Sequence, residues 1–186
     1  MSRVLYYAAA TLDGYIADPD DGIDWLTGYQ GTYGGDDAEA MKGSYDEFYE
    51  GVGAVVMGST TYEWVLDHLD QWPYEGKPAW VLSSRDLRQP EGGGEVNVAD
   101  ASVAELYDEM TGAAGDRDLW VIGGGNVASQ FADEGLLDEV LVTVVPVVLG
   151  GGKPLFDRPV PGGAMQLVGA RTWETGMVEL RYEIRR

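Results

Sequence analysis

The sequence predicts an α/β fold, with a mostly parallel mixed sheet, helices on both faces and an antiparallel hairpin at the C-terminus. Two observations lead to this prediction. Short apolar runs alternate with stretches of helical spacing along most of the chain, which is typical of parallel strands joined by helices. Residues 177–185 instead alternate strictly between apolar and polar side chains, as expected for a strand with one wet face.

Length and composition fit one domain that spans residues 1–186. The chain is 45% hydrophobic and 11% aromatic, enough for a substantial core. Its 32 acidic and 12 basic residues give a formal charge of -20, which disfavours nucleic acid and anionic membranes as partners. Acidity spread along the chain indicates either a salt-adapted, halophilic cytoplasm or an ordinary acidic bacterial protein, and the sequence leaves both open.

The residue inventory excludes several kinds of site. Because the chain has no cysteine, it offers no disulfide, thiolate nucleophile or sulfur-ligated metal. Its single histidine, His68, cannot form a zinc site alone, so we expect no metal. The apolar run at residues 3–10 is too short for a secretory signal, and none approaches the length of a membrane span. We therefore expect a cytoplasmic protein without membrane contact.

The first part of the chain predicts a buried strand, a long loop and a helix. Residues 3–10 form the strand, and the helix is expected at about 36–52. The segment 11–37 between them is too long for a mere connector, so we expect a lid or binding loop over an apolar surface. Its apolar and aromatic side chains are Tyr15, Ile16, Trp25, Leu26 and Tyr29. The helix would present Met41, Tyr45, Phe48, Tyr49 and Val52 on one face.

The rest of the chain alternates between strands and helices. Capping-box patterns mark two helix starts, at Thr60 with Glu63 and at Ser102 with Glu105. Pro146 cannot donate to a ladder and so marks an edge, a bulge or a strand end. We expect strands at 54–57, 79–82, 95–99, 118–122 and 140–149, and a hairpin that pairs 166–173 with 177–185. Helices are expected from about 58, from about 102 and at 126–134. The first of these helices would bury a stripe of Tyr62, Val65, Leu66 and Leu69.

Three strand ends carry residues suited to phosphate groups. Gly58–Thr61 and Gly123–Asn126 each lead from a strand into a helix, whose unpaired N–H groups attract anionic oxygens. Ser83–Arg85 adds hydroxyls and a guanidinium, which suit a phosphate monoester. Strand ends of this kind gather at one edge of a parallel sheet. Together they predict a site for a dinucleotide with an extra phosphate, although a single glycine turn after a strand is more often structural.

Two rival nucleotide motifs fit less well. Gly123 and Gly125 with Ala128 satisfy the letters of the Rossmann fingerprint, but the region about 20 residues further on lacks the acid that would hold the ribose. Gly150–Lys153 imitates a phosphate loop, but Pro154 stands where Ser or Thr would bind magnesium. A Rossmann site is therefore disfavoured, and we discard a nucleoside triphosphatase.

Taken together, the motifs resemble the dihydrofolate reductase superfamily. They lie at residues 11–17, 56–62, 82–85, 121–125 and 145–156, and the last is similar to the reductase domain of the bifunctional riboflavin-biosynthesis deaminase/reductase. The resemblance implies a three-layer dihydrofolate-reductase-like fold with NADPH as cofactor. It also implies an oxidoreductase that reduces a pterin-like or ribosylaminopyrimidine-like small molecule, in the manner of 5-amino-6-(5-phosphoribosylamino)uracil reductase in riboflavin biosynthesis.

The resemblance also assigns the cofactor contacts. The nicotinamide would be bordered by Ala9, Ala10 and Ile16. The pyrophosphate and ribose would lie by Gly58, Ser59, Thr60 and Thr61. The adenosine 2′-phosphate would be taken by Ser83, Ser84 and Arg85. The diphosphate site would be completed by Gly123, Gly124, Gly125, Asn126 and Val127.

The substrate half departs from the folate reductases. Lys42 stands where their proton-relaying carboxylate is expected, which argues against a folate substrate. Reduction of a C=N bond needs a proton for the nitrogen, and Asp13 is the best candidate for a catalytic donor, with water, the substrate itself or a purely structural turn as the alternatives. The aromatic side chains Tyr45, Phe48 and Tyr49 are expected either to line the substrate cavity or to pack in the core.

Two further expectations follow. A non-catalytic NADPH-binding or sensing protein on the same fold is the alternative to a reductase. The alternating, partly apolar C-terminal hairpin offers an edge through which two copies could pair, so a homodimer is expected.

Overall fold

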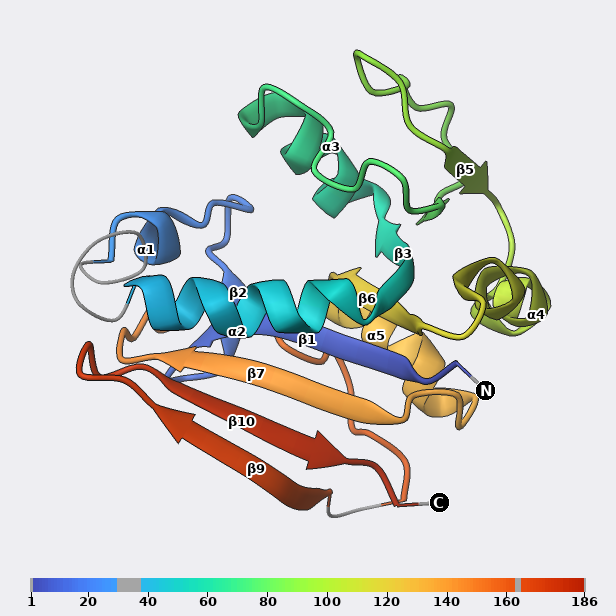
Figure 1. Cartoon of the computed structure of the whole chain (residues 1–186). Helices are drawn as coiled ribbons and strands as arrows, with labels where there is room; N and C mark the ends of the chain where they lie inside the picture. Colours follow the sequence, from blue (N-terminus) through green and yellow to red (C-terminus); the bar gives the residue numbers. More distant parts are fainter. Residues whose placement is uncertain (1, 30–37, 163–164, 186) are drawn as a thin grey trace.

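The computed structural model describes residues 2–29, 38–162 and 165–185, and it confirms the predicted fold class. An eight-stranded sheet lies between two layers of helices, and its C-terminal strands form an antiparallel hairpin (Figure 1). The strands are β1 (Val4–Thr11), β2 (Tyr15–Ala17), β3 (Val52–Gly58), β4 (Ala79–Leu82), β5 (Val96–Ala99), β6 (Asp118–Gly123), β7 (Glu139–Val145), β8 (Lys153–Pro154), β9 (Gln166–Thr172) and β10 (Val178–Glu183). The helices are α1 (Asp24–Thr27), α2 (Ala38–Glu50), α3 (Ser59–His68), α4 (Val103–Ala114) and α5 (Gly125–Asp133).

The strand order of the main sheet is β5-β4-β3-β6-β1-β7-β10-β9. Neighbours from β5 to β7 are parallel, whereas β10 runs antiparallel to both β7 and β9. The short strands β2 and β8 form a separate antiparallel pair. This topology brings the carboxyl ends of β3, β4 and β6 side by side, as the sequence predicts for its three candidate phosphate motifs.

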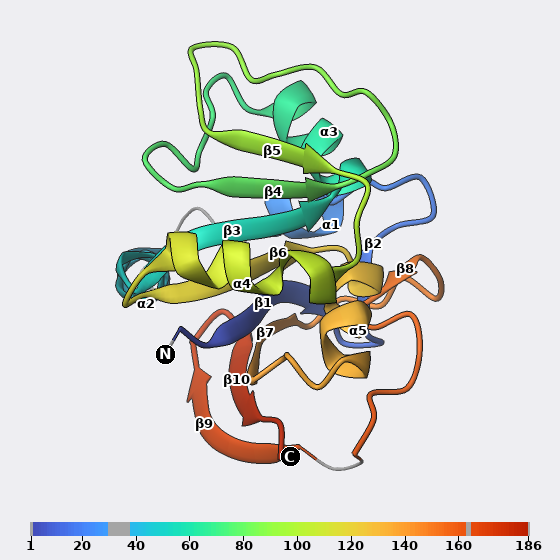
Figure 2. The same cartoon turned by 90° about the vertical axis from the view of Figure 1, so that its right-hand side faces the viewer.

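The helices pack on both faces of the sheet (Figure 2). Helices α4 and α5 cover the face that carries Val4 and Tyr6 of β1. Helices α2 and α3 cover the opposite face, where Tyr7 of β1 packs beside Trp120 of β6. Because side chains alternate along a strand, each second residue of β1 faces the same helix layer. Tyr7 and Ala9 therefore both face the α2 side.

The predicted lid segment contains β2 and α1, and part of it packs over an apolar surface as expected. Residues 30–37, which include the predicted start of the following helix, lie outside the described residues. Near the end of β7, Val145 forms a small core cluster with Trp173 and Met177. The lid side chains packed against this cluster are Trp25, Leu26 and Tyr29. The Tyr29 hydroxyl also donates a hydrogen bond of 2.7 Å to the Thr175 carbonyl.

The predicted caps and ends are partly confirmed. Ser102 and Glu105 form the capping box of α4, and β7 ends at Val145, directly before Pro146. The box at Thr60 is wrong, because α3 begins at Ser59 with Gly58 as its N-cap and has no side-chain cap. This shift of the helix start frees Glu63 from a capping role.

Two residues lie outside the helical faces predicted for them. Val52 belongs to β3, since the chain leaves α2 after Glu50. Leu69 follows the end of α3 and is 43% exposed, so the buried stripe of that helix ends before it. Among the described residues, no helix is both long and apolar enough to span a bilayer.

Candidate active site

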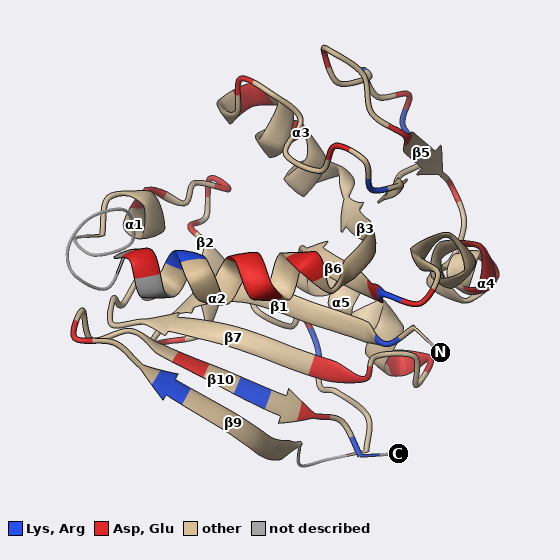
Figure 3. Ribbon diagram, viewed as in Figure 1, with Lys and Arg blue, Asp and Glu red and all other residues tan. Residues whose placement is uncertain are grey.

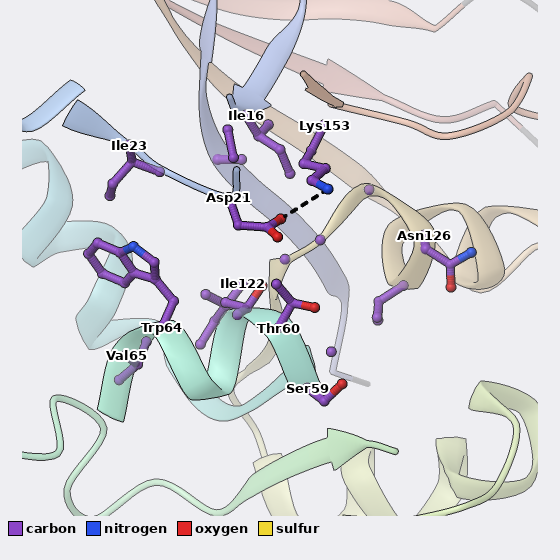
Figure 4. Close-up of a pocket in the computed structure, with 18 of the residues that line it drawn as sticks. Ile16, Asp21, Ile23, Ser59, Thr60, Trp64, Val65, Ile122, Asn126 and Lys153 are labelled. Atoms are coloured by element: carbon purple, nitrogen blue, oxygen red, sulfur yellow. Dashed lines mark ion pairs between the residues drawn. The ribbon is translucent and has the colours of Figure 1, made fainter. Parts of the chain in front are cut away.

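A cavity of about 650 Å³ opens at the carboxyl ends of β3 and β6, between α3, α5 and the lid (Figure 4). Eleven of the fifteen predicted cofactor residues line it: Ala9, Ile16, Gly58, Ser59, Thr60, Thr61, Gly123, Gly124, Gly125, Asn126 and Val127. Four do not line it: Ala10, which is almost fully buried, and Ser83, Ser84 and Arg85. We call this space the cofactor cavity.

Two helix N-termini face the cofactor cavity. Gly58 is the N-cap of α3 and Gly124 that of α5, and neither helix has a side-chain cap. The N–H groups of a first helical turn have no partner within the helix, so both starts can bind anionic oxygens. A side chain at Gly123 would crowd the Thr61 hydroxyl at 3.2 Å. The donor set and the bare glycine backbone therefore fit a dinucleotide diphosphate.

Gly125 is needed for a different reason. A Cβ atom there would collide with the carbonyl oxygen of Pro154 and lie 2.8 Å from that of Leu155. The third glycine of the motif thus lets α5 pack against the segment that follows β8. The sequence predicts the glycine loop, but not that one of its glycines serves packing between backbones.

Charged side chains of both signs line the cofactor cavity: Asp21, Lys153 and Asp157. Lys153 and Asp21 point toward one another, with 3.4 Å between Nζ and Oδ1 (Figure 4). Asn126 donates a 2.6 Å hydrogen bond to Asp157, and this bond is the main cause of the lowered pKa of that carboxyl. Lys153 is a cation that the sequence motifs do not assign to the cofactor, although it belongs both to the imitation phosphate loop and to the motif at 145–156.

Arg85 lies beyond the end of β4, outside the cofactor cavity. Its guanidinium donates two hydrogen bonds to Glu63 of α3, at 3.2 and 2.7 Å. Its backbone N–H donates to the Ser83 hydroxyl at 3.0 Å. The last residue of β4, Leu82, does line the cavity. A phosphate that reached Arg85 from the cavity would compete with Glu63 for the guanidinium.

Asp13 lines neither this cavity nor the neighbouring one. Its carboxylate accepts hydrogen bonds from the Thr11 hydroxyl at 2.6 Å and from the N–H groups of Leu149 and Gly150 at 3.2 and 2.7 Å. These bonds lower the pKa of Asp13, and the Thr11 hydroxyl has the largest effect. A carboxyl group that holds its charge this way is a poor proton donor, so the geometry favours the structural turn among the alternatives.

A second cavity, of about 610 Å³, lies beneath α2 and is mostly apolar. We call it the substrate cavity. Its lining residues are Tyr7, Ala8, Ala9, Leu26, Met41, Lys42, Tyr45, Trp120, Thr143 and Met177. Of the three aromatic residues expected here, Tyr45 lines it, whereas Phe48 and Tyr49 pack edge-on against Trp120 with ring centroids 5.2 and 6.4 Å apart. Lys42 is ion-paired with Asp46 at 2.8 Å.

Two polar side chains of the substrate cavity, Tyr7 and Thr143, form a row with Glu179 of β10, which does not line the cavity. The Tyr7 hydroxyl donates a 3.2 Å hydrogen bond to Glu179 and lies 3.5 Å from the Thr143 hydroxyl. Burial is the main cause that raises the pKa of Tyr7 to about 12. No sequence motif predicts these residues. Alternation places Tyr7 on one face of its strand, but only the register of β1, β7 and β10 brings Thr143 and Glu179 beside it.

The two cavities meet along β1. Both are lined by Tyr7, Ala8, Ala9 and Leu26. Among the residues that the structure describes, no group of three or more His, Cys, Asp or Glu side chains could hold a metal ion.

Known proteins are similar to this chain along nearly its whole length. The RibD C-terminal domain family matches residues 3–178. The chain is 34% identical to the uncharacterized Bacillus subtilis protein YwjB over 182 residues, which cover 97% of each chain. It is 28% identical to the riboflavin biosynthesis protein RibD of Corynebacterium ammoniagenes over 162 residues, which cover 82% of this chain and 45% of that protein. A crystal structure from Shewanella sp. PV-4 covers 99% of both chains with 28% identity and a TM-score of 0.79.

Proposed function

The chain belongs to the RibD C-terminal domain family, and from this membership we propose that it is an NADPH-dependent reductase of a ribosylaminopyrimidine-like or pterin-like small molecule. The observation that carries the proposal is the pair of cavities that meet along β1. One has the helix starts and glycines that suit a dinucleotide, and the other has the aromatic and apolar walls that suit a flat ring.

The residues of the cofactor cavity divide the work of holding NADPH. The first turns of α3 and α5 bind the diphosphate, and Lys153 adds a positive charge beside them. Ser83 and Arg85 bind the 2′-phosphate once Glu63 releases the guanidinium. When bound, the reduced nicotinamide supplies a hydride for the C=N bond of the acceptor.

The residues of the substrate cavity hold and shield the acceptor. Tyr45 offers an aromatic surface to a planar heterocycle, with the buried Trp120 packed against it, and Met41 and Met177 give the cavity adaptable apolar walls. These walls exclude water from the place where the hydride is transferred, which protects the reaction and strengthens nearby polar contacts.

Cofactor binding and turnover test the proposal separately. NADPH binding is measured by the change in its fluorescence, and turnover by the loss of its absorbance with 5-amino-6-(5-phosphoribosylamino)uracil and with dihydrofolate as acceptors. We expect binding, and oxidation in the presence of one or both acceptors. Binding without turnover of either acceptor would favour the non-catalytic sensor, and a protein that does not bind NADPH would overturn the proposal.

A further inference from the structure

Tyr7 occupies the junction of the two cavities. A hydride passes from cofactor to acceptor only where the two molecules touch, so the reacting atoms have to meet where both cavities share a wall. The residues of that wall are Tyr7, Ala8, Ala9 and Leu26. Within this set only Tyr7 has a side chain that can donate a proton.

We propose that the Tyr7 hydroxyl donates the proton that the acceptor nitrogen takes up on reduction, and that Glu179 positions this hydroxyl. The inference rests on the proposed reductase function and deepens it, because it assigns a proton donor within the same site. Tyr7 is then a catalytic residue, whereas Glu179 acts through it.

The surroundings of Tyr7 fix its hydroxyl in place. The Tyr7 ring packs edge-on against Phe48 at 4.7 Å between centroids, and it also contacts Trp120. Its hydroxyl reaches Glu179 at 3.2 Å and Thr143 at 3.5 Å. Thr143 is the register partner of both Ala9 and Glu179, so three adjacent strands hold the group together.

Charged and titratable groups lie on the elements β7, β9, β10 and α2 around this row. Arg171 of β9 is the register partner of Glu179, and Arg181 of β10 is bound to Glu139 of β7. Helix α2 contributes Tyr45 and Lys42 to the same cavity. Glu179 is thus the cross-strand neighbour of Arg171, and its carboxylate accepts the hydrogen of the Tyr7 hydroxyl.

The proposed step balances as follows. The acceptor carbon gains a hydrogen with its bonding pair from the reduced nicotinamide, which is oxidised, and the π bond to nitrogen breaks. The Tyr7 O–H turns from Glu179 to the nitrogen and gives it its proton, and the Tyr7 oxygen is reprotonated from solution, so one turnover consumes the reduced nicotinamide and one solvent proton. Tyr7 keeps its proton at neutral pH because its pKa is raised to about 12, and the nitrogen anion left by hydride transfer is a stronger base than a phenolate.

The first test compares Tyr7→Phe with Tyr182→Phe, which removes a hydroxyl on the opposite face of the sheet. With the acceptor that the wild-type protein reduces, we expect kcat of Tyr7→Phe to fall roughly 100-fold, the usual size of a general-acid effect, at unchanged KM for NADPH. Tyr182→Phe is expected to keep the wild-type kcat. A Tyr7→Phe protein that binds NADPH and retains kcat within about twofold of wild type, well short of that effect, would overturn the proposal.

A binding measurement tests the contact between the Tyr7 hydroxyl and the ligand without turnover. Calorimetry with cofactor-free protein and 5-amino-6-(5-phosphoribitylamino)uracil, the reduced form of the first acceptor, is expected to show roughly fivefold weaker binding to Tyr7→Phe, the size of one lost hydrogen bond. Equal affinity for wild type and Tyr7→Phe would contradict a contact between the hydroxyl and this ligand.

Variants of Glu179 test whether this residue positions the Tyr7 hydroxyl. They also test the proposal if Tyr7→Phe does not fold. Glu179→Gln keeps an oxygen that can accept the Tyr7 hydrogen, so it is expected to retain most of the activity. Glu179→Ala loses that acceptor, and its kcat is expected to fall roughly tenfold at unchanged KM for NADPH. Equal kcat for Glu179→Ala and wild type would overturn the role of Glu179. A wild-type protein that binds NADPH but reduces neither acceptor would instead overturn the proposed function itself.

Discussion

Arg85 illustrates how a single residue can be suited to a ligand and still be engaged elsewhere. Its guanidinium lies beyond β4, where a 2′-phosphate is expected, but it donates two hydrogen bonds to Glu63. The two side chains are 54% and 41% exposed, so water and salt screen the pair, which is worth at most about 1 kcal/mol. A doubly charged phosphate can therefore displace Glu63.

Glu63→Gln should strengthen NADPH binding, because the guanidinium would no longer have to leave a carboxylate. We expect up to about fivefold higher affinity for NADPH and no change for NADH, which lacks the 2′-phosphate. Fluorescence titration with both nucleotides measures this. Glu109→Gln, an exposed change of the same charge on α4, is the control. An equal gain for NADH, or an equal gain in the control, would show a general charge effect and no competition at Arg85.

The hydrogen bonds of Asp13 predict how the stability of the fold depends on pH. Its pKa is lowered from the ordinary 3.8, mainly by the Thr11 hydroxyl and also by backbone N–H groups, so the charged form stabilises the fold. This stability is fully present above pH 3.8 and is lost as the pH falls through the lowered folded-state pKa. Asp13→Asn should thus melt below wild type at neutral pH, and thermal melts should show the gap closing on acidification. The Asp13→Asn protein should still turn over its substrate. Loss of turnover at an unchanged melting temperature would instead indicate that Asp13 is the proton donor.

At the scale of elements, the lid and the segment after β7 form one unit. Strands β2 and β8 pair, the Leu155 N–H donates to the Gly14 carbonyl, and the Leu12 N–H donates to the Val147 carbonyl, both at 2.9 Å. This unit brings Lys153 and Asp21 to the same side of the cofactor cavity. The pairing of β2 with β8 therefore sets the shape of that wall.

Gly152→Ala should disrupt this pairing. Gly152 has φ of +148°, which L side chains rarely adopt, and a Cβ there would collide with the carbonyl oxygen of Ala17 in β2. We expect a loss of about 1–3 kcal/mol in the free energy of unfolding, measured with urea, together with weaker NADPH binding. The matched control is Gly151→Ala, since a Cβ at Gly151 meets nothing within 4 Å. Equal behaviour of the two variants would contradict the role given to the β2–β8 pair.

The same elements show what the sequence can and cannot predict. Every strand of the main sheet and helices α2 to α5 are predicted from the sequence. Strands buried on both faces, such as β3, read as continuous apolar runs, whereas the helices and the hairpin strands show the periodicity of one apolar face. The capping box predicted at Ser102 is confirmed. The one predicted at Thr60 is wrong, because α3 starts one residue after Gly58 and has no side-chain cap. The contact of Tyr7 with Glu179 depends on the register of three strands, and no local pattern encodes a pairing between residues so far apart in the chain.

At the scale of the molecule, β9 forms one edge of the main sheet and exposes Leu167 and Val168, at 50% and 42%. An apolar edge strand is a template for pairing with a second copy. We expect a homodimer in analytical ultracentrifugation and a shift to monomer in Val168→Asp, because a buried charge opposes pairing at this edge. Thr111→Asp lies on α4, which packs on β3 and β6 away from the β9 edge, and it should leave the dimer intact. Wild-type protein that sediments as a monomer at all concentrations would contradict the prediction.

The charge of the whole molecule gives the prediction that separates the two interpretations of its acidity. Acidic side chains lie on α2, α4, β10 and the loops around the sheet (Figure 3), and only part of the 32 can be matched by 12 basic residues. The folded state holds these like charges close together, so repulsion destabilises it relative to the unfolded chain.

Salt shortens the reach of this repulsion, from about 10 Å at 0.1 M to about 3 Å at 1 M. A protein adapted to salt should therefore melt at a higher temperature as KCl rises into the molar range, which a thermal scan at fixed pH measures. The double variant Asp108→Asn with Glu109→Gln removes two neighbouring charges from the exposed side of α4, and its gain from salt should be smaller than that of wild type. A melting temperature that stays flat or falls with KCl would favour an ordinary acidic protein, because the repulsion would then be too weak to govern stability.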